Sequence, residues 1–423
     1  MIERLKTVVL TVLVFLSLIQ TYLLIFGSPK ATPTNPTEYV DAEVSGTRST
    51  IEDVVFPAEL ILHSGKQTHT VLYPNHIHYQ EIMKLLKSRT FENIRRSSPF
   101  LIPEDWEAVR DQHLGLEVRF RGEVPFSVLK SVFQLKGDLP LETDPVSRIW
   151  IFVQKENQEV RTFFFTEYNI FEARADLNNQ NVEQMVGFGE LHGTYQVKNG
   201  IYFPDAPLEM TQYKIAIDSI PIDQLQKTLF VDPRSARNFR NQEGSDIYTD
   251  GKRGLQIDPD QRWMTYTDPV PVVSTRNDVR ANLIAAIQFI NQHGGWNGQF
   301  IAKTIPQVPA IGRQHFTFLQ YYDSFPIVSN RINGFGQIRI SVQNRVVSNY
   351  ERSMITLDET TIERSLKTIA GGKALDDLFA AFPRKGNVVA LTPAYLPVVE
   401  EGFIDLIPVW AAEMRDGTFE ILR

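Results

Sequence analysis

A run of twenty uncharged residues, Thr7–Phe26, opens an otherwise soluble-looking chain and constrains it more than any other feature. As a helix rising about 1.5 Å per residue, the run extends over roughly 30 Å, the thickness of a bilayer's hydrocarbon core. Arg4 and Lys6 precede the run, and a single lysine closely follows it. The positive-inside rule then places the N-terminus in the cytoplasm. We predict a cytoplasmic tail over residues 1–6 and a transmembrane helix over residues 7–26.

A cleaved signal peptide is the alternative interpretation of this run. Signal peptides have an apolar stretch of about 7–15 residues, followed by a cleavage site of small residues. The run is longer than that, and Phe26-Gly27-Ser28-Pro29 is a poor cleavage site. An uncleaved anchor is favoured, which predicts a single-pass protein of the cell membrane with the bulk of the chain extracytoplasmic.

Polar residues within the run indicate a contact surface. Leu13, Ser17, Gln20 and Leu24 lie at spacings i, i+4, i+7 and i+11 and so share one helical face. In lipid, close packing and hydrogen bonds hold helices together, because the hydrophobic effect does not act between them. We predict partner binding through this face. The alternative, equally open, is that Gln20 lies shallow enough to meet water or headgroups.

Composition limits what the part after the run can be. Its roughly 400 residues suffice for two or three domains. Apolar residues make up 43% of the chain and charged residues 22%, as in globular proteins. The net charge is −7, which disfavours nucleic-acid binding. There is no cysteine, so every cysteine-based nucleophile and iron–sulfur site is excluded, and an export environment without disulfides is indicated.

The remaining pattern predicts an α+β protein in which helices pack on antiparallel sheets. Strands are predicted at Ala58–His63 and His69–Tyr73, and helices at Asn277–His293 and Thr361–Ile369. The predicted organisation is an extended, proline-containing spacer over 28–50, a first α+β domain over 51–145, a second over 146–272 and a C-terminal α+β domain over 273–423.

No complete catalytic or metal-binding motif occurs in the sequence. Ser127 and Lys130 match the S-x-x-K motif of penicillin-binding proteins, but the S-x-N and K-T-G elements are missing. His76 and His78 resemble a metal-binding pair, yet no third ligand follows at a recognisable spacing, so a loop pair is favoured. We therefore predict no catalytic, cofactor-binding or metal-binding residue, and no enzyme activity.

Three arginines, Arg234, Arg237 and Arg240, lie three residues apart. On a helix they would form one basic stripe able to bind an anionic ligand or a partner. Acidic residues such as Asp232 lie close by in sequence, and a solvated surface of mixed charge is favoured.

The order of anchor, spacer and α+β regions resembles the YycH family. The similarity covers essentially the whole chain, and its most specific part is the stretch 229–255. The residues that carry it are Leu229-Phe230-Val231-Asp232-Pro233, Tyr248-Thr249-Asp250-Gly251, Arg253-Gly254-Leu255, Tyr321-Tyr322, Phe325-Pro326-Ile327 and Pro408-Val409-Trp410.

The resemblance implies a non-enzymatic regulator from Gram-positive bacteria. YycH-like proteins sit in the membrane with a partner, YycI, whose outer domain resembles the C-terminal part of YycH. Together they act on the sensor histidine kinase WalK, which with WalR controls cell-wall metabolism, and the contact involves transmembrane helices. The expected partners are therefore a YycI-like single-pass protein and a WalK-like kinase, and the direction of regulation is left open.

Two other classes remain as alternatives. A membrane-anchored extracytoplasmic cell-wall hydrolase would need a deep acidic cleft containing a carboxyl group whose pKa is raised by burial. A receptor for a small molecule or peptide would need a pocket of several hundred cubic ångströms lined by aromatic residues in the C-terminal sheet.

Overall fold

The computed structural model describes residues 2–26, 46–97, 105–137, 144–260, 262–271, 277–306, 312–329, 331 and 333–422. The chain divides into two compact units, Met1–Val40 and Asp41–Arg423. In the first unit, helix α1 covers Ile2–Phe26, as predicted for the uncharged run. Among the described residues, no helix combines the length and apolar character that crossing a membrane requires. Most of the predicted spacer, residues 28–45, lies outside the described residues.

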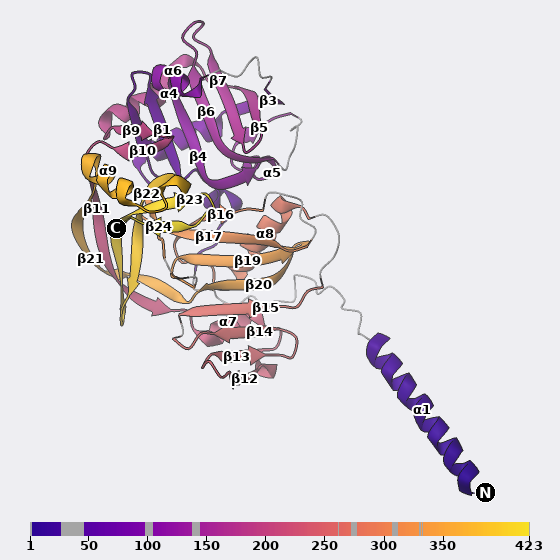
Figure 1. Ribbon diagram of the computed structural model, residues 1–423. Coiled ribbons are helices and arrows are strands. Elements are labelled where there is room, and N and C mark those ends of the chain that lie inside the picture. The colour runs from indigo at the N-terminus through magenta and orange to yellow at the C-terminus, as the bar shows by residue number, and fades with distance from the viewer. Residues whose placement is uncertain are drawn as a thin grey trace. The chain divides into compact units, whose positions relative to one another are not determined.

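Residues 59–204 supply one ten-stranded sheet (Figure 1). Its order is β10-β9-β2-β1-β4-β6-β7-β8-β3-β5, and only β3 and β5 pair in parallel. The strands are β1 (Glu59–Ser64), β2 (His69–Leu72), β3 (Thr90–Arg96), β4 (Leu114–Pro125), β5 (Gln134–Leu135), β6 (Pro145–Val153), β7 (Val160–Thr166), β8 (Ile170–Ala175), β9 (Tyr195–Lys198) and β10 (Ile201–Pro204). The helices are α2 (Ile51–Val54), α3 (Ile77–Ser88), α4 (Trp106–Gln112), α5 (Phe126–Leu129), α6 (Asn179–Gly187) and the 3-10 helix η2 (Phe188–Leu191).

Both faces of this sheet are covered at its centre. Phe163, Phe164 and Phe165 of β7 are all buried, although successive residues of a strand lie on opposite faces. On one face, Phe163 and Phe165 pack against Trp106 of α4. On the other, Phe164 packs against Phe126 of α5. Because α4 and α5 lie on opposite sides of the sheet, the three phenylalanines of β7 form an apolar run without alternation.

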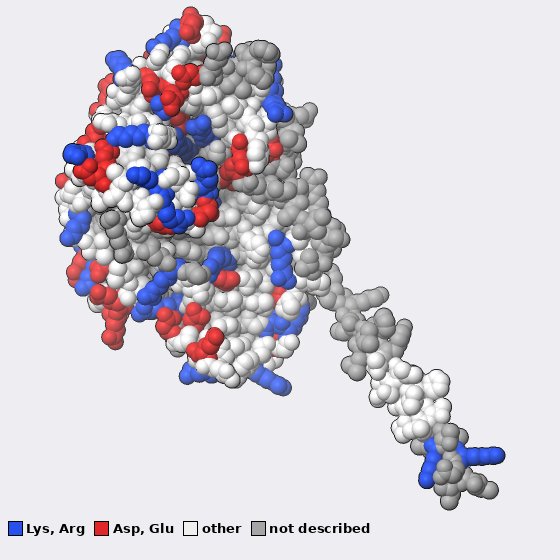
Figure 2. All heavy atoms as spheres, in the orientation of Figure 1, with Lys and Arg blue, Asp and Glu red and all other residues white. Residues whose placement is uncertain are grey.

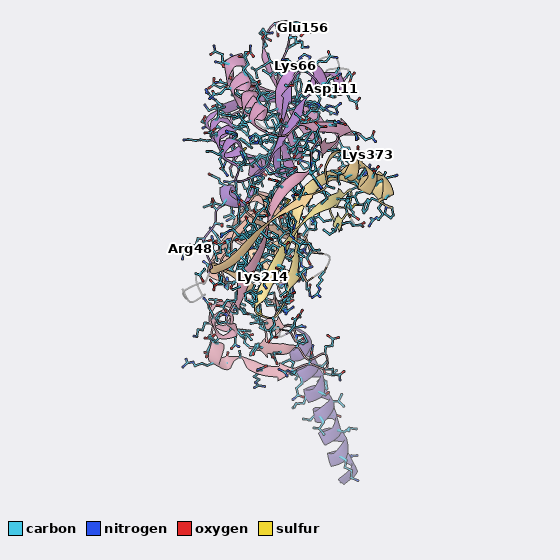
Figure 3. The ribbon with its side chains drawn as sticks, turned by 90° about the vertical axis from the view of Figure 1, so that its left-hand side faces the viewer. Arg48, Lys66, Asp111, Glu156, Lys214 and Lys373 are labelled. Atoms are coloured by element: carbon cyan, nitrogen blue, oxygen red, sulfur yellow. The ribbon has the colours of Figure 1, made fainter. Side chains whose placement is uncertain are left out.

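A five-stranded sheet contains strands from the middle and the end of the chain. Its order is β21-β11-β23-β22, and β24 pairs with β23. The strands are β11 (Leu208–Ser219), β21 (Ile355–Ile369), β22 (Val388–Val399), β23 (Phe403–Met414) and β24 (Phe419–Ile421). Helix α9 (Gly372–Ala381) packs on it through Leu375, which is fully buried, while Lys373 on the same helix is exposed (Figure 3). The Trp410 indole N–H donates to the Ala370 carbonyl at 2.7 Å and fixes the start of α9.

A nine-stranded sheet completes the second unit, with order β12-β13-β14-β15-β20-β19-β17-β16 and β18 paired with β17. The strands are β12 (Arg237–Arg240), β13 (Asp246–Thr249), β14 (Gly254–Ile257), β15 (Trp263–Thr267), β16 (Gln299–Thr304), β17 (Gln314–Tyr322), β18 (Phe325–Pro326), β19 (Gln337–Gln343) and β20 (Val346–Ser353). Helices α7 (Ile222–Leu229) and α8 (Val279–Gln292) accompany it. Helix α8 is capped by Asp278, which accepts from the Ala281 N–H at 3.1 Å, and its buried stripe includes Leu283 and Ile287.

One of the predicted helices is a strand in the structure. Residues 361–369 are strand, not helix, because they pair with β11 along most of the length of β21. Gly371, which follows this strand, is the N-cap residue of helix α9. A Cβ there would lie 2.0 Å from the Ala206 carbonyl oxygen, so the glycine allows two chain segments to approach closely.

The sheets also cross the predicted domain bounds. β4 pairs with β6 across the bound at 145/146, and β15 pairs with β20 across the bound at 272/273. The α+β class itself is confirmed by the three mostly antiparallel sheets and their few packed helices.

Candidate functional site

The predicted partner face on α1 is exposed where the structure describes it. Leu13, Ser17 and Gln20 are exposed, and the side chain of Leu24 lies outside the described residues. The Thr21 hydroxyl donates to the Ser17 carbonyl at 2.8 Å, a bond within the helix itself. Partner binding through this face remains a prediction.

The three arginines of the predicted basic stripe do not form one. Arg234 lies in the 3-10 helix η3 (Pro233–Ser235), whereas Arg237 and Arg240 lie in the edge strand β12. Residues three apart in a strand lie on opposite faces. The Arg240 guanidinium donates to both carboxylate oxygens of Asp246, at 2.9 and 3.1 Å. The group is therefore part of an exposed surface of mixed charge.

A buried polar network crosses the ten-stranded sheet. His63 of β1 and His69 of β2 are directly opposed, with 2.9 Å between their Nδ1 atoms. His63 Nε2 lies 3.3 Å from the Glu117 carboxylate, and Arg119 donates to the same carboxylate at 2.7 Å. His69 Nε2 lies 3.5 Å from Asp111, which Figure 3 labels near one end of the sheet.

The charges of this network are set by burial and by ion pairing. Burial alone would raise the pKa of Glu117, but the Arg119 guanidinium and the His63 hydrogen bond hold it well below its usual value. Burial lowers the pKa of His63, and burial together with the nearby His63 lowers the pKa of His69 to about 4. At neutral pH Glu117 is therefore a carboxylate beside the Arg119 guanidinium, and the two imidazoles are neutral.

Arg121 of β4 lies where the three sheets meet, and we call its surroundings the charged junction. Its guanidinium is buried and donates to the Tyr321 hydroxyl of β17 at 3.1 Å, to Glu413 of β23 at 2.9 Å and to Thr392 of β22 at 3.5 Å. Lys303 of β16 lies in the same cleft, which has a volume of about 850 Å³.

The charged junction does not have the character expected of a hydrolase cleft. Burial does raise the pKa of Glu59, which lines the cleft. However, five cationic side chains line the cleft beside five acidic ones, and Glu413 is paired with Arg121. Figure 2 likewise shows basic and acidic side chains interspersed over one face of the molecule. The cleft is balanced in charge, not deeply acidic.

An aromatic cavity of about 710 Å³ lies beside strand β21. Trp296, Tyr213, Tyr321 and Tyr322 contribute to its wall, and the rings of Tyr213 and Tyr322 are 4.8 Å apart. Residues 356–359 and 364 of β21 line another part of the wall, and polar residues such as Gln299, Gln320 and Asp323 also contribute to it. This is the kind of pocket that the receptor hypothesis required, and it adjoins the exposed part of an edge strand.

Strand β21 forms the outer edge of the five-stranded sheet. Residues 359–368, which we call the β21 surface, are all exposed except the half-buried Ile362. Because the β21 surface is exposed on both faces, its side chains are accessible. Because β21 lies at the edge of the sheet, the backbone groups along its outer side are accessible as well. Leu366 is 65% exposed, which is high for an apolar residue in a strand.

The histidine pair gains a third member that sequence reasoning missed. His76 is the N-cap residue of helix α3 and His78 lies in its first turn, so the predicted loop pair lies at the start of a helix. His192, which directly follows η2, lies 2.8 Å from His78 (Nε2 to Nδ1). No spacing signal could reveal this, because 114 residues separate His78 from His192. Ser127 and Lys130, the S-x-x-K match, lie in and directly after α5, and Ser127 is half-buried.

The fold and these surfaces define a class: an α+β protein of three sheets whose described clefts are lined by paired charges or aromatic rings. Comparisons with known proteins identify the family. The family model described as "YycH protein, N-terminal domain" matches residues 3–186, and "YycH protein, C-terminal domain" matches residues 198–421. The chain belongs to the YycH family, which confirms the resemblance seen in the sequence.

One curated relative and one solved structure span nearly the whole chain. The "Two-component system WalR/WalK regulatory protein YycH" of Bacillus subtilis is 20% identical over 458 residues, covering 100% of this chain and 96% of that protein. The crystal structure of YycH from Bacillus subtilis has a TM-score of 0.72 at 17% identity, and the match covers 90% of this chain and 99% of that one. At this identity the structural match establishes the fold.

Proposed function

We propose that this protein is a non-enzymatic regulator of a cell-wall sensor histidine kinase, anchored in the membrane of a Gram-positive bacterium. The observation that carries the proposal is the family match, since a relative named as a WalR/WalK regulatory protein aligns over the full length of this chain. Neither the comparisons nor the balanced charge of the cleft favours the hydrolase alternative.

Membrane anchoring is part of the proposal. The uncharged run 7–26 is a single helix, flanked by Arg4 and Lys6 on its N-terminal side. The N-terminal family match begins at residue 3 and so includes this run. The proposed topology is single-pass, with the N-terminus cytoplasmic and the three-sheet unit extracytoplasmic.

Regulation would act through contacts between transmembrane helices. Leu13, Ser17, Gln20 and Leu24 form the proposed contact face toward a WalK-like kinase and a YycI-like partner. Such contacts shift the signalling equilibrium of the kinase only if they bind one of its states better than the other. Tight but equal binding to both states would change nothing.

The outer contact with the YycI-like partner is proposed to lie on the β21 surface. Support comes from its exposure on both faces, from exposed Leu366 and from the adjoining aromatic cavity. An edge strand offers unpaired backbone groups to a second chain, and the cavity offers room for a side chain.

The test of the membrane contact is a pull-down of the full-length protein from solubilised membranes, with mass spectrometry of the captured membrane proteins. Wild type is compared with Ser17→Leu/Gln20→Leu and with the control Thr11→Leu, a polar-to-leucine change on another face of the helix. We expect wild type and control to capture a histidine kinase and a second single-pass protein, and the double variant to lose both.

The outcomes separate the parts of the proposal. If the double variant captures the same membrane proteins as wild type, the contact does not depend on the α1 face. Absence of a kinase from the wild-type sample, under conditions that preserve other membrane complexes, would contradict the regulator function. Leu366→Glu tests the outer contact, with Phe239→Glu on exposed edge strand β12 as control. Equal partner capture by both variants would argue against the β21 surface.

A further inference from the structure

Three histidine side chains converge at the start of helix α3. His76, His78 and His192 each offer one nitrogen, and the three nitrogens lie within 4.8 Å of one another. All three side chains are half-buried. The rings of His76 and His192 meet edge to face at 4.5 Å, and those of His78 and His192 at 5.1 Å.

The surrounding structure holds these rings in place. His78 stacks on Phe188 of η2 with 4.7 Å between ring centroids and 9° between ring planes. The segment carrying His192 is tied to the ten-stranded sheet, because the Thr70 hydroxyl of β2 donates to the Gly189 carbonyl at 3.3 Å. The ring positions therefore follow from packed elements on both sides of the cluster, and not from the three histidines alone.

We infer that His76, His78 and His192 form a binding site for a divalent transition-metal ion of the zinc class. Neutral imidazole is a preferred ligand of Zn²⁺. At Zn–N distances of about 2.0–2.1 Å, tetrahedral ligand nitrogens lie about 3.3 Å apart, so the cluster needs only small side-chain shifts to close on an ion.

Two hydrogen bonds of the cluster would change when the ion binds. The bond between His78 Nδ1 and His192 Nε2, 2.8 Å long, uses a proton that the metal ion would replace. The His78 backbone N–H donates to His76 Nδ1 across 3.3 Å, a long bond. A neutral imidazole has one unprotonated nitrogen, whose lone pair accepts this hydrogen bond in His76. A metal ion bound to His76 would take that lone pair, so the hydrogen bond would be lost.

The cluster supplies three ligands and leaves a fourth position open. His76 and His192 line a cavity of about 690 Å³, whose wall also includes Tyr73, Tyr195 and Phe325. Three protein ligands with one open position characterise zinc sites that accept water or another ligand, whereas purely structural sites are closed by four protein ligands. The fourth ligand at this site is therefore a solvent molecule in the cavity.

The position of the site in the chain indicates what the ion would do. His192 lies in residues 187–197, between the ranges matched by the N-terminal and C-terminal family models. His76 and His78 lie well within the N-terminal range. A bound ion would tie the start of α3 to the segment that leads from one range into the other. Occupancy would therefore stiffen this connection.

The test uses the metal-stripped full-length protein in detergent, titrated calorimetrically with ZnCl₂ alone. Wild type is expected to bind one ion per chain, and His192→Asn to lose at least about tenfold in affinity. His315→Asn, at an exposed histidine outside the cluster, is the matched control and should bind as wild type does. Zinc should raise the melting temperature of wild type and control but not of His192→Asn.

A second variant and a spectroscopic measurement distinguish loss of the metal site from loss of the fold. If His192→Asn without metal melts well below metal-free wild type, His76→Asn replaces it in the same titration. Co²⁺ substituted for Zn²⁺ should give the intense visible absorption of a tetrahedral site in wild type and in His315→Asn, but not in the variants of the three clustered histidines. Absence of stoichiometric zinc binding by wild type, or equal binding by all histidine variants, would overturn the inference.

Discussion

Glu117 is a buried carboxylate in the polar network of the ten-stranded sheet. Its carboxylate is almost completely buried and is satisfied by Arg119 at 2.7 Å, by His63 at 3.3 Å and by the Tyr202 hydroxyl at 3.3 Å. A buried charge is tolerated only when such partners replace the lost hydration. The network is therefore sensitive to the loss of any single member.

Replacing Glu117 with glutamine should leave the Arg119 guanidinium without its closest counter-charge. We expect the free energy of unfolding to fall by about 3–5 kcal/mol, the usual cost of breaking a buried ion pair. Chemical unfolding of wild type and Glu117→Gln measures the change. Asp223→Asn removes the exposed partner of Lys227 and should leave the free energy of unfolding almost unchanged. Equal losses in both variants would contradict the assignment.

The protein should lose stability in acid because two of its histidines are buried in the neutral form. Burial lowers the pKa of His293 to about 4, and burial with nearby His63 lowers that of His69 to about 4, against an ordinary value near 6.5. Between pH 6.5 and 4 the unfolded chain binds protons that the folded chain does not, so stability falls as the pH falls through this window. Above pH 6.5 this contribution is fully present.

The corresponding measurement is the unfolding midpoint as a function of pH. His293 is fully buried, and such a histidine contributes up to about 1.4 kcal/mol per pH unit within the window. His293→Gln should flatten the curve between pH 6.5 and 4, with His315→Gln as the control for the substitution itself. A curve that stays as steep in His293→Gln would show that other groups take up the protons.

At the scale of single elements, helix α9 depends on one apolar anchor. Leu375 is its one fully buried residue in the described structure, whereas Leu366 of the neighbouring strand β21 is 65% exposed. Leu375→Ala should cost about 2–5 kcal/mol through lost burial and the cavity left behind. Leu366→Ala, the same chemical change, should stay within about 0.5 kcal/mol. Thermal melts of both variants decide the comparison, and similar shifts would mean that α9 is anchored elsewhere.

Helix α8 and strand β21 show how far local sequence patterns predict structure. Helix α8 was predictable because its apolar stripe, its Asp278 cap and the following glycines all favour one structure. Residues 361–369 carry apolar residues at helical spacing too, namely Ile362, Leu366 and Ile369. They nevertheless form a strand, because pairing with β11 satisfies their backbone and outweighs the local pattern.

At the scale of the whole second unit, Arg121 connects three sheets that are distant in sequence. It lies in the ten-stranded sheet and binds Tyr321, Thr392 and Glu413 from the other two. Its aliphatic part is buried as well, and its guanidinium lies 5.1 Å from the Phe419 ring centroid. The charged junction thus joins the regions matched by the two family models.

Arg121→Met should weaken this connection while keeping an apolar side chain of similar length. We expect calorimetry to show one main unfolding transition of the wild-type unit. In the variant, one of the two regions matched by the family models should unfold at a lower temperature than the other. The physical reason is that Glu413 loses its buried partner, a change worth about 3–5 kcal/mol. Arg240→Met removes a mostly exposed ion pair and is the control. Unchanged cooperativity in Arg121→Met would mean that apolar packing alone couples the sheets.

The sequence by itself determined the α+β class, the helical run at the N-terminus, the strands at Ala58–His63 and His69–Tyr73, helix α8 and the family. These features depend on local periodicity, capping residues and characteristic short motifs, all of which lie within a few residues of one another. It did not determine the joining of strands into three sheets, the site of Arg121 or the meeting of His76 and His78 with His192. These depend on contacts between residues tens to hundreds of positions apart, which only the packing of the folded chain brings together.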